Sequence, residues 1–157
     1  LHTPLVHNTF RLRASATVGI AVAPGHGDTS DGLLRRAEIA AYYTQQLADL
    51  EDRIILPRVR PTNKHAWFFY AIRIKNRDEI VRYLKTKGID TRVAWPLAIH
   101  RQPVYQELLA GSQCPVADEV AGTVLNLPMY YDMTEDELRY VIIHIKDAVS
   151  QMGSKIQ

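Results

Sequence analysis

The sequence has little of what a disulfide-bonded, membrane-spanning or nucleic-acid-binding protein needs. Its single cysteine, Cys114, cannot form an internal disulfide, and no Cys/His spacing predicts a zinc site. No apolar run approaches the length required to cross a bilayer. The net charge of +2, from 19 basic and 17 acidic residues, offers no strong field to a nucleic acid. These absences predict a cytoplasmic protein that binds neither a membrane nor a nucleic acid.

The apolar pattern predicts one α+β body. The chain has 157 residues, 46% of them hydrophobic, which is enough for a single core. Period-two alternation and β-branched or aromatic runs predict strands at residues 5–7, 10–22, 54–56, 65–74 and 89–95. Helical spacing predicts helices at residues 31–50, 76–88, 104–109, 117–124 and 134–152. We therefore expect an N-terminal β-hairpin and a helix joined to a sheet with helices packed on it.

Two helix starts and the hairpin carry more specific expectations. Asn76 with Glu79, and Thr134 with Glu137, have the spacing of a capping box. A two-stranded hairpin is marginal in water by itself. The hairpin at residues 5–22 is therefore expected to pack on or extend the sheet, or to pair with a second copy, which would allow a homodimer.

Most of the chain resembles one enzyme family. The segments RRAEIAAYYTQQLADL, HAWFFYAIRI, NRDEIVRYLKTKGIDTRVAWPLAIHRQPVY and LNLPMYYDMTEDELRYVI follow that family's order. The most specific part is a loop with Pro96, His100, Pro103 and Tyr105, followed by the Leu127-Pro128 turn. Together, residues 36–152 resemble the C-terminal small domain of the DegT/DnrJ/StrS family, which are sugar aminotransferases dependent on pyridoxal phosphate.

The resemblance implies a catalytically incomplete piece of such an enzyme. In the family, the small domain packs on a large domain that binds pyridoxal phosphate, and the reaction moves an amino group onto a nucleotide-linked keto sugar. The Schiff-base lysine, the carboxylate facing the pyridinium and the phosphate cradle lie upstream of the matched region. The chain alone is therefore expected to hold no catalytic residue and no cofactor, and to meet a nucleotide sugar only with a large domain present.

The first forty residues resemble a different family. The run RASATVGIAVAPGHGDTSDGLLRRAEIA is similar to the tail half of a GGDEF diguanylate cyclase domain, with Thr17 in place of that family's serine. The glycine-rich signature that binds GTP and metal in that family would lie upstream of Leu1. The hypothesis is a chimera, with a GGDEF-like segment at residues 1–42 and an aminotransferase small domain at 36–157, joined within the shared helix at 31–50.

Three residues of the proline-bounded loop are candidates for substrate binding. His100 lies where the backbone is restrained and a side chain can be offered to a ligand, and the resemblance places it toward the substrate. The alternative, which is commoner, is a histidine that hydrogen-bonds local backbone. Trp95 and Tyr105 could stack on a sugar or base, although aromatics beside prolines more often cover the edge of a core.

A run of basic residues is the remaining candidate. Lys64 is the substrate-binding candidate in a group that could hold the diphosphate of a nucleotide sugar, together with Arg58, Arg60, Arg73, Lys75 and Arg77. The commoner interpretation is a charged, solvated strand edge. The spacing of His26, Asp28 and Asp31 matches no metal site, and none is predicted.

Three functions stay open at this point. The first is an aminotransferase-derived domain that supplies substrate-side residues. The second is a noncatalytic chimeric scaffold that binds no ligand. The third, nucleotide binding related to diguanylate cyclases, has the least support because the binding residues of that family lie outside the chain.

Overall fold

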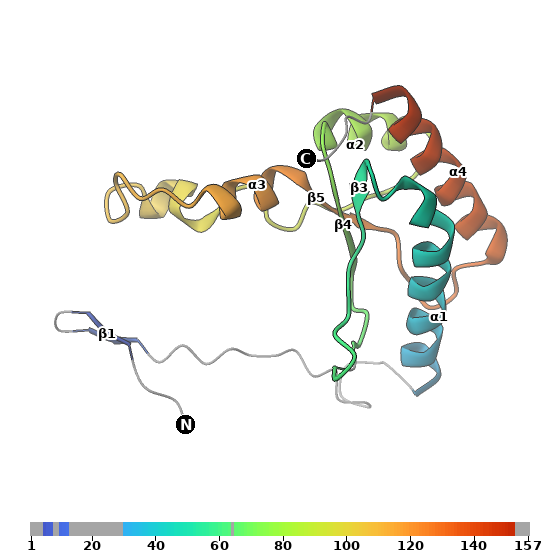
Figure 1. Cartoon of the computed structure of the whole chain (residues 1–157), viewed down its shortest axis with the longest axis horizontal. Coiled ribbons are helices and arrows are strands. Elements are labelled where there is room, and N and C mark those ends of the chain that lie inside the picture. Colours follow the sequence, from blue (N-terminus) through green and yellow to red (C-terminus); the bar gives the residue numbers. More distant parts are fainter. Residues whose placement is uncertain (1–4, 8–9, 13–29, 64, 153–157) are drawn as a thin grey trace.

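The structure is a computed structural model that describes residues 5–7, 10–12, 30–63 and 65–152. It confirms the α+β expectation. Figure 1 labels its elements, which in chain order are β1 (Leu5–His7), β2 (Phe10–Leu12), α1 (Ser30–Leu47), η1 (Ala48–Leu50), β3 (Ile54–Ile55), β4 (Tyr70–Ile74), α2 (Arg77–Thr86), η2 (Ile99–Arg101), η3 (Pro103–Tyr105), α3 (Pro115–Thr123), β5 (Val124–Leu127) and α4 (Glu135–Met152).

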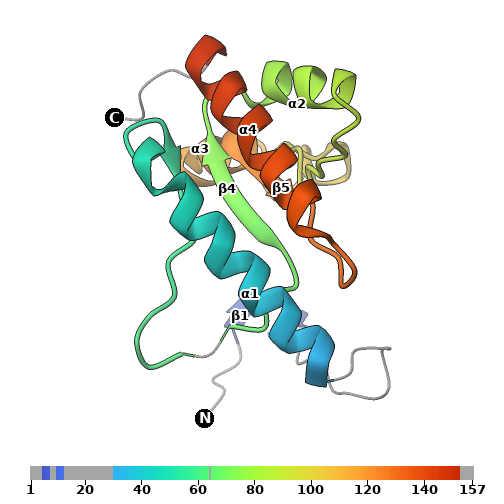
Figure 2. The same cartoon turned by 90° about the vertical axis from the view of Figure 1, so that its right-hand side faces the viewer.

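A three-stranded antiparallel sheet in the order β3-β4-β5 lies at the centre. In β4, Tyr70, Ile72 and Ile74 are buried and alternate with half-buried residues, so one face of the strand contributes most to the core. Figure 2 shows α1 and α4 side by side in front of this sheet, with α2 behind α4. The sheet and the helices thus form two layers around one core.

The helices bury the faces that their spacing predicts. Ile39, Tyr43 and Leu47 of α1 are four residues apart and are completely buried. The buried stripe of α4 follows the same period and consists of Leu138, Val141, Ile142, Ile145, Ala148 and Val149. In α2, Ile80 and Leu84 complete the core. Gly88 has a φ of +71°, and its N–H donates to the carbonyl of Lys85, which closes α2 where the sequence predicts its end.

The predicted strand at residues 89–95 is wrong. Among the described residues of this segment only Arg92 pairs, in an isolated bridge with Asn126. The third strand of the sheet is β5 instead, where Leu125, Asn126 and Leu127 are all buried. The sequence predicts a helix end at residue 124 and a turn at Leu127-Pro128 here, because a four-residue apolar run is too short for periodicity to distinguish a strand.

Two other predicted elements are shorter than expected. The strand predicted from residue 65 begins only at Tyr70, because Trp67 has a φ of +49° that a strand cannot accommodate. The helix predicted at residues 104–109 is a single 3₁₀ turn, η3, followed by turns. The predicted helices at 31–50, 117–124 and 134–152 are confirmed as α1 with η1, α3 and α4.

The hairpin is confirmed in its pairing. β1 and β2 are antiparallel, with Leu5 opposite Leu12 and His7 opposite Phe10. They form a sheet of their own, so within the described residues the hairpin does not extend the β3-β4-β5 sheet. The rest of the strand predicted to residue 22 lies outside the described residues, as do His26 and Asp28, for which no metal site is predicted.

One predicted capping box is correct and the other is wrong. The N–H and hydroxyl of Thr134 each donate to the Glu137 carboxylate at 2.8 Å, and the Glu137 N–H donates back to the Thr134 hydroxyl at 3.2 Å. Asn76 instead adopts a left-handed conformation, with a φ of +56°, and makes no side-chain cap. Its amide donates to the Met152 carbonyl at 2.7 Å, which ties the start of α2 to the end of α4.

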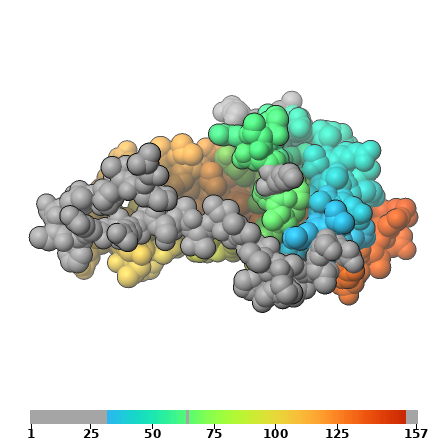
Figure 3. Space-filling view, turned by 90° about the horizontal axis from the view of Figure 1, so that it is seen from below, coloured from blue at the N-terminus to red at the C-terminus, as the bar shows by residue number. Residues whose placement is uncertain are grey.

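Residues 95–123, which we call the arm, extend away from this body. Figure 1 shows the arm running sideways from the sheet, and Figure 3 shows it in yellow and orange beyond the body. The arm contains η2, η3 and α3, and most of its residues are exposed. None of the helices in the described part of the chain is both long and apolar enough to cross a membrane.

Candidate functional site

The base of the arm holds a pocket of about 560 Å³ between η2 and the start of α3. The pocket is built from turns and a helix start because Pro103 and Pro115 restrict the backbone at two places in this region. Its polar side chains include His100, Arg101 and Asp118. Cys114, an exposed thiol, lies at its edge immediately before α3.

His100 and Arg101 both contact one carboxylate in this pocket. The imidazole Nε2 of His100 lies 3.2 Å from the carboxylate of Asp118. Arg101 donates from Nε and Nη2 to the two oxygens of the same carboxylate, at 3.2 and 3.0 Å. This bidentate geometry is the one in which a guanidinium binds a carboxylate most strongly. The three side chains therefore form one charged cluster between η2 and α3.

The electrostatics of the cluster keep the carboxylate ionised. The hydrogen bonds from Arg101 are the largest cause that holds the pKa of Asp118 below its ordinary value, and the hydrogen bond with His100 acts in the same direction. The pKa of Arg101 is raised, first by its hydrogen bonds to Asp118. Asp118 is thus a hydrogen-bond acceptor throughout the neutral range.

The structure separates the four candidates that the sequence suggested. His100 lines the pocket and is 9% exposed, and its polar contact is with Asp118 of another element. Trp95 and Tyr105 are 69% and 39% exposed, and neither lines this pocket. Lys64 lies outside the described residues. Substrate contact by these residues stays a prediction.

The basic group does not converge on a common anion site. Arg58 and Arg60 are exposed, as a solvated edge predicts. Arg73 donates to Glu119 and Thr123 of α3, and Arg77 donates to Asp78 and to the carbonyl of Ala121. Arg77 is only 7% exposed, so the solvated-edge interpretation is wrong for it. These two arginines hold α3 in place.

Asp118 is the residue that sequence analysis missed. It is 18 positions from His100 and belongs to a different helix. An acidic residue in the first turn of a helix is common, because it interacts favourably with the helix dipole, so the sequence provides no signal that separates Asp118 from any other. The contact exists only because the chain folds back between η2 and α3.

The pocket lacks the residue that would form a Schiff base with pyridoxal phosphate. No lysine is among the residues that line it. Of the described lysines, Lys75 follows β4, Lys85 and Lys87 lie at the end of α2, and Lys146 of α4 pairs with Asp49 at 2.8 Å. The residues around His100 therefore do not fit this cofactor by themselves. The described residues also contain no group of three or more side chains suited to a metal ion.

Comparison with known proteins defines the class as aminotransferases. The model of the DegT/DnrJ/EryC1/StrS aminotransferase family matches residues 29–146, which include the sheet, the arm and most of α4. The chain belongs to this family. The matched stretch contains His100, Arg101 and Asp118.

Individual relatives agree with the family model. The erythromycin biosynthesis sensory transduction protein EryC1 of Saccharopolyspora erythraea is 34% identical over 71% of this chain and 31% of its own length. The dTDP-3-amino-3,4,6-trideoxy-alpha-D-glucose transaminase of Streptomyces venezuelae is 30% identical over 93% of this chain and 37% of its own length. The chain thus spans about a third of these relatives.

A solved structure supports the fold. NtdA from Bacillus subtilis, determined with bound cofactor PMP, superposes with a TM-score of 0.68 and 27% identity over 76% of this chain and 29% of that one. About three quarters of this chain therefore share the fold of about a third of that longer protein.

Proposed function

We propose that this chain is the C-terminal small domain of a sugar aminotransferase and supplies the substrate-facing side of its active site. The observation that carries the proposal is the His100 pocket, which lies within the family match and contains an ordered polar cluster but no lysine. The relatives are about three times as long as the matched region, which leaves room elsewhere for a Schiff-base lysine and a phosphate site. Amino transfer then requires that larger part.

The substrate class follows from the relatives. The Streptomyces venezuelae relative is named as a transaminase of a dTDP-amino sugar, and the Bacillus subtilis structure holds PMP. We infer that the assembled enzyme uses pyridoxal phosphate and a nucleotide-linked sugar, with His100 near the sugar. A cytoplasmic location is part of the same proposal.

The exposed apolar side chains of the arm support an assembly surface. Six of them are at least half exposed, namely Trp95, Leu97, Ile99, Val104, Leu108 and Val116. Large apolar residues gathered on one projecting segment are typical of a protein contact. We infer that the arm packs on the larger part of the aminotransferase, or on the corresponding part of a second subunit in a homodimer.

A complementation experiment tests the proposal. The chain would be mixed with a separately expressed segment of the Streptomyces venezuelae relative that lacks the matching third, and amino transfer from glutamate to a dTDP-keto sugar would be measured. Activity is expected only in the mixture, and His100→Gln should lower kcat/KM. His65→Gln is the matched control, because His65 is exposed and lies outside the pocket.

The contrary results separate the alternatives. A mixture that forms a stable complex but transfers no amino group would favour the noncatalytic scaffold. A covalent adduct of pyridoxal phosphate at one lysine of the chain alone, trapped by borohydride and mapped by mass spectrometry, would contradict the absence of a cofactor site.

The origin of residues 1–42 is a separate hypothesis. Their resemblance to a GGDEF domain supports a chimera with a junction in α1. The match to the Streptomyces venezuelae relative covers 93% of the chain and so includes most of these residues, which favours one continuous aminotransferase sequence instead. A genomic locus that encodes an uninterrupted aminotransferase through α1 would contradict the chimera. Saturable GTP binding by the chain would support the cyclase-related alternative.

A further inference from the structure

A second pocket, of about 610 Å³, lies where the end of α2 meets the start of α4. Figure 2 shows the chain that leaves α2 passing beside α4, and the Tyr140 hydroxyl of α4 donates to the Lys87 carbonyl at 3.1 Å across this junction. The Tyr140 ring also packs edge-on against His144, with the ring centroids 4.4 Å apart. The pocket shares no lining residue with the His100 pocket, so it is a separate site.

The pocket combines an apolar floor with aromatic walls. The floor belongs to the hydrophobic core and includes the buried side chains of Ile89, Met133 and Val141. Tyr130 and Tyr140 also line the pocket and are 43% and 46% exposed, which leaves part of each tyrosine accessible to a ligand. The pKa of Tyr130 is raised, first by burial and then by a hydrogen bond to Glu137. An aromatic ring and a carboxylate are therefore neighbours at this site.

The lining carries negative charge that the protein does not neutralise. Its three carboxylates are those of Asp90, Asp136 and Glu137, and it includes no lysine or arginine. Within the part of the chain that the structure describes, only Asp136 has a cationic partner, Arg139, at 3.4 Å. The pKa of Glu137 is lowered, first by the backbone N–H of Thr134, so this carboxylate is ionised at neutral pH. The pocket is thus locally negative in a chain whose net charge is +2.

The start of α4 does not make this an anion site. A helix N-terminus by itself favours a negative group. Here the Glu137 carboxylate already accepts the N–H and the hydroxyl of Thr134, each at 2.8 Å. The protein's own carboxylate therefore caps the helix, and the charge of the lining determines the sign of a ligand.

We propose that this pocket binds an organic cation with an apolar body, of the quaternary ammonium class, independently of the proposed amino transfer. The apolar floor takes the methyl groups, the tyrosine rings contact the cation, and Asp90 and Glu137 supply the opposite charge. A bare metal ion fits less well, because the described residues contain no group of three or more side chains suited to one.

Two probes of matched shape test the charge recognition. Choline carries a quaternary nitrogen, and dimethylbutanol has carbon in its place and no charge. Each would be titrated into the ¹⁵N-labelled 157-residue chain, and amide chemical shifts would be followed. Choline should give saturable shifts at Gly88, Asp90 and Tyr130, which line the pocket. Dimethylbutanol should bind at least about tenfold more weakly, because it makes neither the cation–π nor the charge contact.

Single substitutions test the location. Asp90→Asn removes an exposed carboxylate that has no cationic partner among the described residues, and it should weaken choline binding about two- to fivefold. Tyr130→Leu keeps an apolar side chain but removes the ring, and a loss of about two- to fivefold is expected. Glu107→Gln is the matched control, because it removes an exposed carboxylate outside this pocket, and it should leave the affinity unchanged.

Several results would overturn the proposal. The absence of saturable choline shifts would remove the site, and equal affinities for the two probes would show that charge is not recognised. Unchanged choline affinity in both Asp90→Asn and Tyr130→Leu would place the cation elsewhere. The comparison of the two probes uses the wild-type chain, so it decides the question even if a variant does not fold.

Discussion

The hydroxyl of Tyr43 donates a 2.8 Å hydrogen bond to the carbonyl oxygen of Pro128, 85 residues further along the chain. Tyr43 is completely buried in α1, and Pro128 directly follows β5. Burial is the main cause that raises the pKa of Tyr43 well above its ordinary value, so the hydroxyl stays a donor. The contact joins α1 to the residue that directly follows β5.

Tyr43→Phe should therefore destabilise the fold. The substitution keeps the ring but leaves a carbonyl without its buried donor, which costs about 1–2 kcal/mol of the free energy of unfolding. Urea denaturation followed by circular dichroism measures the difference. Tyr140→Phe is the matched control, because its hydroxyl donates to the Lys87 carbonyl at an exposed position, and a change within about 0.5 kcal/mol is expected there. Equal effects would contradict the role of burial.

The capping box of α4 predicts a pH dependence of stability. The backbone N–H of Thr134 is the largest cause that holds the pKa of Glu137 below its ordinary value of 4.5. As the pH falls through 4.5, the unfolded chain takes up this proton before the folded chain does, so stability decreases until the lower folded pKa is reached. Asp118, whose pKa is also lowered, acts in the same direction.

Urea midpoints measured from pH 7 to pH 3 check this dependence. Glu137→Gln should have a lower urea midpoint than the wild type at neutral pH. The difference between the two midpoints should narrow in acid, because protonation of Glu137 removes from the wild type the ionised carboxylate that the variant already lacks. Glu135→Gln is the control, because the exposed Glu135 carboxylate pairs with Arg139 of the same helix, and its urea midpoints should run parallel to those of the wild type. A difference in urea midpoint that stays constant from pH 7 to pH 3 would contradict the lowered pKa of Glu137.

Asn76 combines an unusual backbone conformation with a side-chain contact, and two substitutions separate them. Glycine tolerates a φ of +56° but removes the amide that donates to Met152, whereas alanine removes the amide and also strains the backbone. Asn76→Ala should be less stable than Asn76→Gly by about 1 kcal/mol. Thermal denaturation of the two variants measures the difference, and an inverted order would contradict the left-handed conformation.

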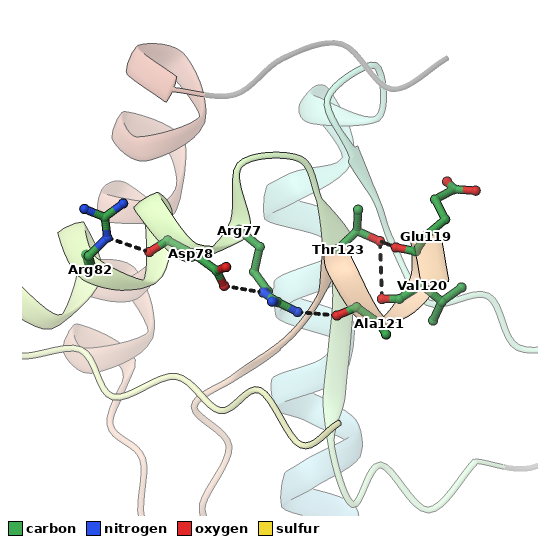
Figure 4. Close-up of polar contacts among 7 residues, drawn as sticks. All are labelled: Arg77, Asp78, Arg82, Glu119, Val120, Ala121 and Thr123. Atoms are coloured by element: carbon green, nitrogen blue, oxygen red, sulfur yellow. Dashed lines mark hydrogen bonds and ion pairs between the residues drawn. The ribbon is translucent and has the colours of Figure 1, made fainter. Parts of the chain in front are cut away.

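Arg77 is expected to brace α3 more than it stabilises the body. Arg77→Met retains an apolar stem but leaves the Ala121 carbonyl without its donor, at a cost of about 1–3 kcal/mol. Hydrogen exchange should accelerate in α3 and remain slow in the centre of α4. Arg82→Met is the control, since Arg82 is exposed and contacts only the Asp78 carbonyl of its own helix among the contacts that Figure 4 draws. Uniform acceleration in both helices would show that Arg77 stabilises the whole fold instead.

Local sequence signals predicted the helices well and the sheet poorly. The apolar period of α1 and α4 extends over four or more turns, so the buried faces follow from the sequence alone. β5 has four residues and resembles the end of the preceding helix. The segment at residues 89–95 has a strand-like composition, yet only Arg92 pairs with β5. Pairing depends on which edge is available, which no local pattern records.

The sequence by itself determined the family, the α+β class and His100 as a residue of interest. The prolines, the histidine and the tyrosine of the proline-bounded loop can be recognised from their order and spacing in the sequence, because prolines restrict the local backbone. Only the tertiary structure decided that His100 and Arg101 both contact the carboxylate of Asp118. It also decided that Arg73 and Arg77 bind α3 and not a phosphate. Charged side chains look alike in a sequence, and their partners are set by the packing of distant elements.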